Sequence, residues 1–132
     1  TGDGKPEIIC CQGGCFGYAE IPDDPTQKWT FTPISENGGY QRFTHGIGVG
    51  DVDDDGHLDM LAAHGWWKNP GTSATNESPK PWPFQAFAFA GTSAQMYAVD
   101  FDGDQQNEVV SSLQAHGYGL NMFDKVANRA AG

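Results

Sequence analysis

The chain alternates between short apolar segments and turns rich in glycine, proline and acidic residues. Aromatic and β-branched residues in the apolar segments favour extended strands, and clusters of turn residues separate them. We therefore predict ten strands, at residues 7–11, 16–21, 29–33, 45–52, 58–63, 66–69, 83–90, 95–101, 108–113 and 120–125. Residues 69–81, which are rich in Pro, Ser, Thr and Asn, are predicted to form an exposed loop.

An acidic motif divides these strands into repeats. Residues 51–59 read D-x-D-x-D-G-x-x-D, residues 100–108 read D-x-D-x-D-x-x-x-E, and residues 3–7 match the second half of the pattern. The last carboxylates, of Glu7, Asp59 and Glu108, recur about every 50 residues, which is the length of a propeller blade. The sequence thus predicts one repeat domain over residues 1–132, with units of about 1–44, 45–94 and 95–132 that hold three, four and three strands.

Composition and charge support a turn-rich, mostly β, acidic globular domain. The 132 residues suffice for one domain, and 7 Lys plus Arg against 17 Asp plus Glu give a net charge of −10. Nucleic acids and anionic membranes attract basic faces, so both partners are disfavoured. The 18 glycines and 8 prolines argue against a helical bundle, and 12% aromatic residues are too many for a disordered acidic chain. No apolar run reaches the roughly 20 residues of a membrane span.

The repeated loop between short strands resembles the FG-GAP/VCBS class of calcium-binding β-propeller repeats. Residues 48–71, GVGDVDDDGHLDMLAAHGWWKNPG, are similar to the repeat pattern of that class and to repeats in large secreted proteins of environmental bacteria. The resemblance implies four-stranded blades, calcium in the loop between the first two strands, and an extracellular or cell-surface location. It fixes no activity, because members serve as adhesion modules, lectins and non-catalytic parts of polysaccharide-active enzymes.

The loops also fit calcium chemically, because this cation takes roughly six to eight oxygen ligands. The ligands predicted in the first loop are Asp51, Asp53, Asp55, the carbonyl of His57, and Asp59. Gly56 permits the sharp turn at loop position 6, and Asp54 is expected to face solvent. The ligands predicted in the second loop are Asp100, Asp102, Asp104, the carbonyl of Gln106, and Glu108. Here Gln105 stands at position 6 and Gly103 at position 4, so the second loop matches the pattern less well.

A third, partial ligand set lies near the N-terminus and consists of Asp3, the carbonyl of Lys5, and Glu7. None of the loops is an EF-hand, because position 12 is Ala62 in one full loop and Ser111 in the other, where an EF-hand needs glutamate. The alternative is a polar turn that uses aspartate for its turn propensity. Five carboxylates within residues 51–59 repel one another, however, unless a cation offsets them.

Three cysteines, Cys10, Cys11 and Cys15, leave several arrangements open. They could be small buried strand residues. Cys15 could also form a disulfide with Cys10 or Cys11, which leaves one thiol unpaired. A metal site is the third arrangement, although the spacing lacks the usual CxxC knuckle. Asn76 begins an N-glycosylation sequon.

Histidines and aromatic residues offer two further kinds of site. His45, His64 and His116 each precede a glycine, and His64 and His116 occupy matching places in their repeats. A three-histidine centre could bind zinc or copper, whereas the alternative is that each histidine bonds a neighbouring strand. His57 is expected to be exposed. Aromatic residues that could stack on sugars, or instead form the core, are Trp66, Trp67, Trp82, Tyr118 and Phe123.

These patterns predict a non-catalytic, calcium-stabilised extracellular module for assembly or adhesion. A closed propeller needs at least four blades, roughly, and the chain holds about 2.6 repeats. Either it is a fragment of a larger protein, or copies pair through their open edges into a homo-oligomer or filament. The alternatives are a carbohydrate-binding module, a non-catalytic part of a polysaccharide-active enzyme, or a metalloenzyme fragment that uses the three histidines.

Overall fold

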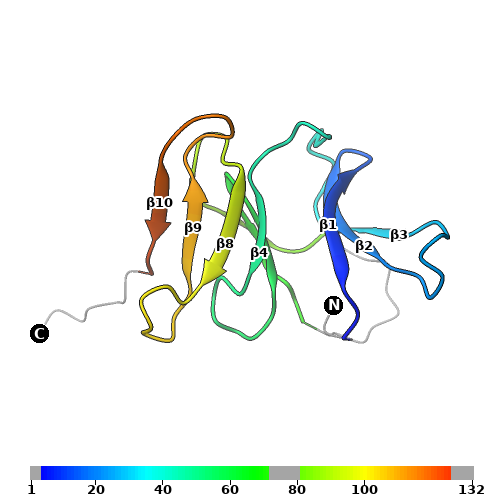
Figure 1. The fold of residues 1–132 in the computed structure, drawn as a ribbon, viewed down its shortest axis with the longest axis horizontal. Coiled ribbons are helices and arrows are strands. Elements are labelled where there is room, and N and C mark those ends of the chain that lie inside the picture. Colours follow the sequence, from blue (N-terminus) through cyan, green and yellow to red (C-terminus); the bar gives the residue numbers. More distant parts are fainter. Residues whose placement is uncertain (1–3, 72–80, 126–132) are drawn as a thin grey trace, which may run out of the picture. The chain divides into compact units, whose positions relative to one another are not determined.

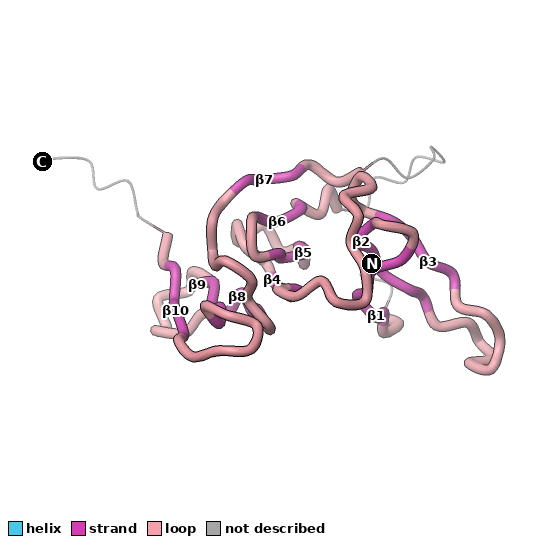
Figure 2. Tube along the Cα trace, turned by 90° about the horizontal axis from the view of Figure 1, so that it is seen from above, coloured by secondary structure: helices cyan, strands magenta, loops and turns pink. Residues whose placement is uncertain are grey.

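The computed structural model describes residues 4–71 and 81–125, which form an all-β fold (Figure 1). This part of the chain contains ten strands and no helix, and the strands are short relative to the loops (Figure 2). The predicted fold class, short strands of incomplete propeller-like repeats joined by acidic loops, is confirmed. A search of the same residues finds no helix with the length and apolar character of a membrane span. Asp3 and Asn76 lie outside the described residues.

One compact unit comprises residues 1–44 and 69–84, as far as they are described. Its sheet has the order β1 (Glu7–Gln12), β2 (Cys15–Glu20), β3 (Thr30–Pro33), with both pairs antiparallel. Phe16 on β2 is fully buried, and its ring lies 4.2 Å from that of Tyr40. The Phe16 carbonyl accepts a 2.9 Å hydrogen bond from the Ile34 N–H, which holds the segment after β3 against β2.

The three cysteines lie in the β1–β2 hairpin of this unit as half-buried free thiols. Cys10 is paired with Gly17 and Cys11 with Phe16, so the two neighbouring side chains point to opposite faces of the sheet. Burial raises the pKa of the Cys10 thiol and of the Cys11 thiol. Of the three predicted arrangements, the structure therefore has the one of unbridged strand cysteines.

The second compact unit comprises residues 45–68 and 85–132, again as far as they are described. Most of it is a seven-stranded sheet of order β10-β9-β8-β4-β5-β6-β7. The strands are β4 (Ile47–Gly50), β5 (Asp59–Ala62), β6 (Gly65–Trp67), β7 (Phe84–Ala86), β8 (Gln95–Val99), β9 (Glu108–Ser112) and β10 (Leu120–Phe123). The acidic motifs thus connect β4 to β5 and β8 to β9, as the sequence predicted.

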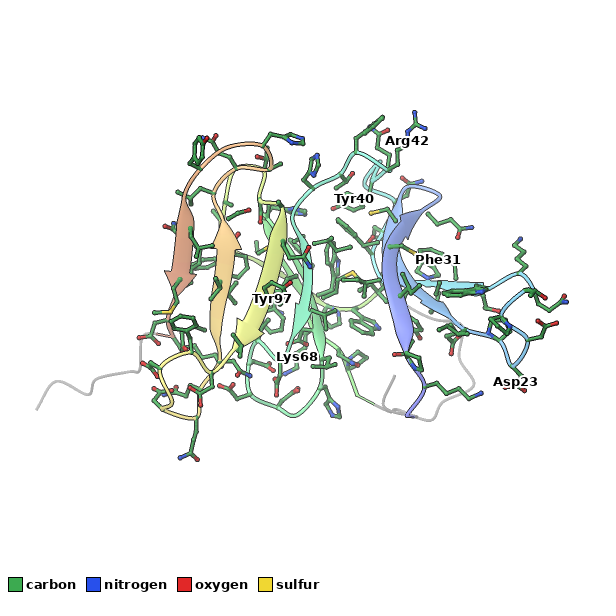
Figure 3. All side chains as sticks on the ribbon, in the orientation of Figure 1. Asp23, Phe31, Tyr40, Arg42, Lys68 and Tyr97 are labelled. Atoms are coloured by element: carbon green, nitrogen blue, oxygen red, sulfur yellow. The ribbon has the colours of Figure 1, made fainter. Side chains whose placement is uncertain are left out.

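The core of the second unit lies on one face of this sheet. Its buried members are Val52, Leu61, Phe89, Met96 and Val109, and Trp66, Ala98 and Phe123 pack against them. The side chains of β8 alternate accordingly, because Met96 is buried while Tyr97 and Val99, which point to the opposite face, are about half exposed. Figure 3 shows Tyr97 on the outward face of β8.

The strand predicted at residues 83–90 is shorter than expected. Regular pairing ends at Ala86, the last residue of β7. The following segment is instead held by the turn after β5, since the Phe87 N–H donates to the His64 carbonyl and the Phe89 N–H to the Ala63 carbonyl. Phe89 enters the core and stacks against Phe87 and Phe123 at ring distances of 4.7 and 5.4 Å. Of the aromatic residues that suggested a strand, Phe89 therefore serves core packing, whereas Phe84 and Phe87 stay about half exposed.

The sequence did not predict that the opening strands of two repeats pair directly. β4 and β8 run parallel, with Gly48 opposite Met96, and so join both repeats into one sheet. Glycine makes this approach possible, because a Cβ at Gly48 would lie 2.1 Å from the Met96 carbonyl oxygen, and one at Gly50 would lie 2.5 Å from the Ala98 Cβ. Because parallel strands end at the same edge, both acidic loops lie at one end of the sheet (Figure 1).

We predict that Gly48→Ala lowers the free energy of unfolding by about 2 kcal/mol, because the added methyl group forces β8 away from β4. Thermal or denaturant unfolding measures the loss. Gly91→Ala is the matched control, since a Cβ there meets nothing within 4 Å. Equal stability of the two variants would contradict the close parallel pair.

Candidate metal centre

The first acidic loop wraps around the carboxylate of its first residue. Both oxygens of Asp51 accept main-chain hydrogen bonds, from the N–H of Asp55 at 3.0 Å and of Gly56 at 2.8 Å. Asp55 in turn accepts one from the His57 N–H at 2.9 Å. These bonds curl residues 51–57 into a compact loop whose carboxylates converge. His57 is exposed, as expected.

The second loop has a similar scheme, in which one donor to the first carboxylate lies at loop position 4 instead of position 5. Asp100 accepts from the N–H groups of Gly103 and Gln105, at 2.7 and 3.0 Å. Asp104 accepts from the Gln106 N–H at 2.8 Å and from the Gln106 side-chain amide at 3.0 Å. Two loops of different sequence thus adopt one hydrogen-bonded form, which supports a shared role for the motif.

The last carboxylate of each motif is buried and ties the loop to the sheet. Asp59 is fully buried at the start of β5, and its Oδ2 accepts a 2.9 Å hydrogen bond from the Val52 N–H. Glu108 is 1% exposed at the start of β9, and its Oε2 accepts a 2.8 Å bond from the Phe101 N–H. A buried carboxylate is costly unless hydrogen bonds and a positive charge compensate it. Both loops therefore favour a cation beside this group.

Each loop gathers three carboxylates tightly enough to hold one ion. Oxygens of Asp51, Asp53 and Asp59 lie within 4.8 Å of one another, and so do oxygens of Asp100, Asp102 and Glu108. These six residues are among the predicted ligands. Asp55 and Asp104 lie outside the two groups, and in the described chain they accept the N–H of the residues whose carbonyls were predicted as ligands. All donors gathered here are oxygens, which suits a hard divalent cation.

The partial N-terminal set is only partly described. Glu7 is the first residue of β1, the same place that Asp59 has in β5 and Glu108 in β9. The exposed Lys5 directs its ammonium to Asp23, at 3.3 Å. Asp3 lies outside the described residues, and the carboxylate groups found among the described residues belong to the two full loops.

Asp54 is exposed, as expected, but its carboxylate is not a spare one. Its Oδ1 accepts a 3.0 Å hydrogen bond from the Asn107 N–H of the second loop, and its Oδ2 contacts the Lys125 ammonium. The Asn107 side chain also donates to the Asp51 carbonyl, at 2.8 Å. The parallel pairing of β4 and β8 brings the loops this close, and Asn107 links them.

A lysine also reaches the carboxylates of the first loop. The ammonium of Lys68, which follows β6, contacts the Asp53 carboxylate and lies 2.8 Å from Asp55 Oδ2. Figure 3 shows Lys68 beside the loop that follows β4. The hydrogen bond from Lys68 lowers the pKa of Asp55, and the hydrogen bond to Asp53 raises the pKa of Lys68. Sequence reasoning missed Lys68, Lys125 and Asn107, because the two lysines lie outside the repeated motif and Asn107 stands at a position that the motif leaves unspecified.

The three histidines do not meet in one centre. His45 and His116 lie edge to face, with ring centroids 4.8 Å apart, whereas His64 lies against Trp67 at 5.9 Å. Within residues 4–71 and 81–125, the groups of three or more potential metal ligands are the two acidic ones, and neither contains a histidine or a cysteine. The predicted alternative of a three-histidine or three-cysteine metal centre is therefore wrong for these residues.

Most of the aromatic residues considered for sugar stacking serve packing instead. Trp67 is buried, and Trp66 and Phe123 pack against the core of the second unit. Trp82 belongs to the first unit and is half-buried. Its main-chain N–H donates to the Ile34 carbonyl of the same unit. Tyr118 alone of this set is fully open, at 98% exposure.

We predict that Asn107→Ala lowers the free energy of unfolding by about 1 kcal/mol, because the Asp51 carbonyl loses its side-chain donor. Chemical denaturation measures the change. Asn121→Ala serves as the control, since Asn121 is an exposed residue of β10 outside both loops. An equal effect in the two variants would argue against a link between the loops.

Comparison with known proteins gives no match to a family model, to a curated protein or to a solved structure. The features that point to a ligand are the two loops themselves. They share one hydrogen-bonded form, a buried final carboxylate and a tight group of three acidic residues. Either group could hold a metal ion.

Proposed function

We propose that this chain is a calcium-stabilised extracellular β-repeat module of FG-GAP/VCBS type that associates with further copies through its open sheet edges. The observation that carries the calcium assignment is the repetition of one acidic, hydrogen-bonded loop form at the same end of one sheet. Carboxylates and main-chain carbonyls are the ligands that calcium prefers, whereas zinc and copper favour the nitrogen and sulfur donors that these groups lack.

Calcium would act on the fold because its ligands are continuous with the core. Asp59 is followed directly by Met60 and Leu61, both buried, and Glu108 is followed by Val109, a member of the core cluster. A cation held by the loop therefore also holds the first residue of a central strand. The millimolar calcium available outside cells suits modest sites of this kind, which supports the extracellular assignment.

Support for self-association comes from the outer strand and outward face of the seven-stranded sheet. β10 is the last strand in the sheet order and exposes Leu120 by 72% and Met122 by 50%. Met122 shares a row with Val110 and Tyr97 across β10, β9 and β8, so exposed apolar side chains cover this face. Open strand edges and exposed apolar patches both favour pairing with another chain. A head-to-tail contact between the first repeat of one copy and the last repeat of another would give a ring or a filament.

We predict that a calcium chelator lowers the melting temperature by about ten degrees or more. A ligand at a thousand times its Kd adds about 4 kcal/mol to the native state, and each kcal/mol is worth a few degrees in a domain of this size. Asp53→Ala, which disables one of the two loops, should have part of this effect, whereas Asp23→Ala, an exposed residue outside the loops, should have little. An identical melting curve with and without chelator would refute the calcium assignment.

We predict that the calcium-loaded protein forms oligomers or fibres at protein concentrations on the order of tens of micromolar. Light scattering coupled to size-exclusion chromatography measures the mass. Met122→Lys should shift the protein towards the monomer, because it places a charge on the exposed face of β10. Phe43→Lys is the control, as this exposed apolar residue lies outside the strands. A well-folded wild-type monomer under these conditions would show that the assembly proposal is wrong.

A further inference from the structure

The first loop already holds a cation supplied by the chain. Lys68 directly follows Trp67, a buried residue at the end of β6, so its main chain is fixed by the sheet. From there its ammonium contacts the carboxylate of Asp53 and lies 2.8 Å from that of Asp55. The side chains of Lys68, Asp53 and Asp55 are all about one third exposed. The two ion pairs that they form therefore lie at the surface of the loop and not in the core.

The second loop has no such partner within the described residues. Its carboxylates bind main-chain N–H groups and the amide of Gln106, and no ion pair among residues 4–71 and 81–125 reaches them. The other lysine near the loops, Lys125, contacts Asp54 and therefore also adds its charge to the first loop. Two ammonium groups thus partly neutralise the negative charge of the first loop. None of the described ammonium groups does so for the second loop.

We propose that Lys68 is a built-in competitor for the cation of the first loop, so that the second loop fills with calcium first. This inference rests on the proposed calcium sites. Asp53 is one of the three carboxylates that would hold the ion. An ammonium group and a divalent cation repel each other, so both cannot bind closely to the same carboxylate. An ion entering the first loop must release Lys68, whereas no ammonium group of the described residues lies against the carboxylates of the second loop. The motif alone suggests the opposite order, because the first loop has the additional acidic residue and the glycine at position 6.

Calorimetric titration with calcium chloride at neutral pH tests the proposal on loop-specific backgrounds. Asp102→Ala leaves the first loop intact, and Asp53→Ala leaves the second. We expect the Asp53→Ala protein to bind calcium more tightly than the Asp102→Ala protein. Adding Lys68→Gln should raise calcium affinity about tenfold on the Asp102→Ala background and change it less than about twofold on the Asp53→Ala background.

Two further variants separate competition from a structural effect. Lys68→Met, which keeps the length and apolar stem of the side chain, should raise the affinity as Lys68→Gln does. Lys125→Gln should change it less, because Asp54 lies outside the group of three carboxylates. Calcium binding by both backgrounds with no gain from either Lys68 variant, or tighter binding by the first loop, would overturn the competitor role while the calcium sites stand. Absence of calcium binding in the wild-type protein would overturn both.

Discussion

The fold depends on one repeated contact, in which a buried carboxylate accepts the N–H of the second residue of its own acidic loop. In the first loop Asp59 bonds Val52, and in the second Glu108 bonds Phe101. Each carboxylate begins a central strand, so the contact closes the loop and sets where β5 and β9 start. The negative charge is buried together with the strand, which is tolerable only with compensation. A cation bound at either group, as we propose, would therefore be coupled to formation of the sheet in this unit.

Local patterns in the sequence predicted the strands and the carboxylates that converge in the loops, because both are properties of short segments. Alternation and turn residues mark ten strands at nearly the observed places, and the acidic spacing marks the carboxylates that converge. The failures are all long-range. Asn107 bonds Asp54 across 53 residues and Lys125 contacts it across 71, and neither partner carries a repeat signal. The strand at 83–90 failed for a related reason, since Phe89 is drawn into a core built from distant segments.

The histidines show why matching places in two repeats need not become neighbours. β4 and β8 lie parallel at the centre of the sheet, and their repeats extend from this pair in opposite directions. His116, in the turn after β9, and His64, in the turn after β5, are thus on opposite sides of the central pair. His45 precedes β4 and lies at the same end of the sheet, which is why it contacts His116. The parallel pair, made possible by Gly48 and Gly50, decides which residues can meet.

Backbone strain does not distinguish the two acidic loops from each other. Loop positions 4 and 6 have positive φ in both, with Asp54 at 59° and Gly56 at 87° in the first loop, and Gly103 at 86° and Gln105 at 71° in the second. Each loop therefore has one glycine and one non-glycine residue in the left-handed region, in exchanged order, so the cost of strain is similar. What differs is charge, because lysines reach the first loop and, among the described residues, not the second. In the proposed competition, the order in which the loops bind a cation follows from these long-range ion pairs and not from the motif.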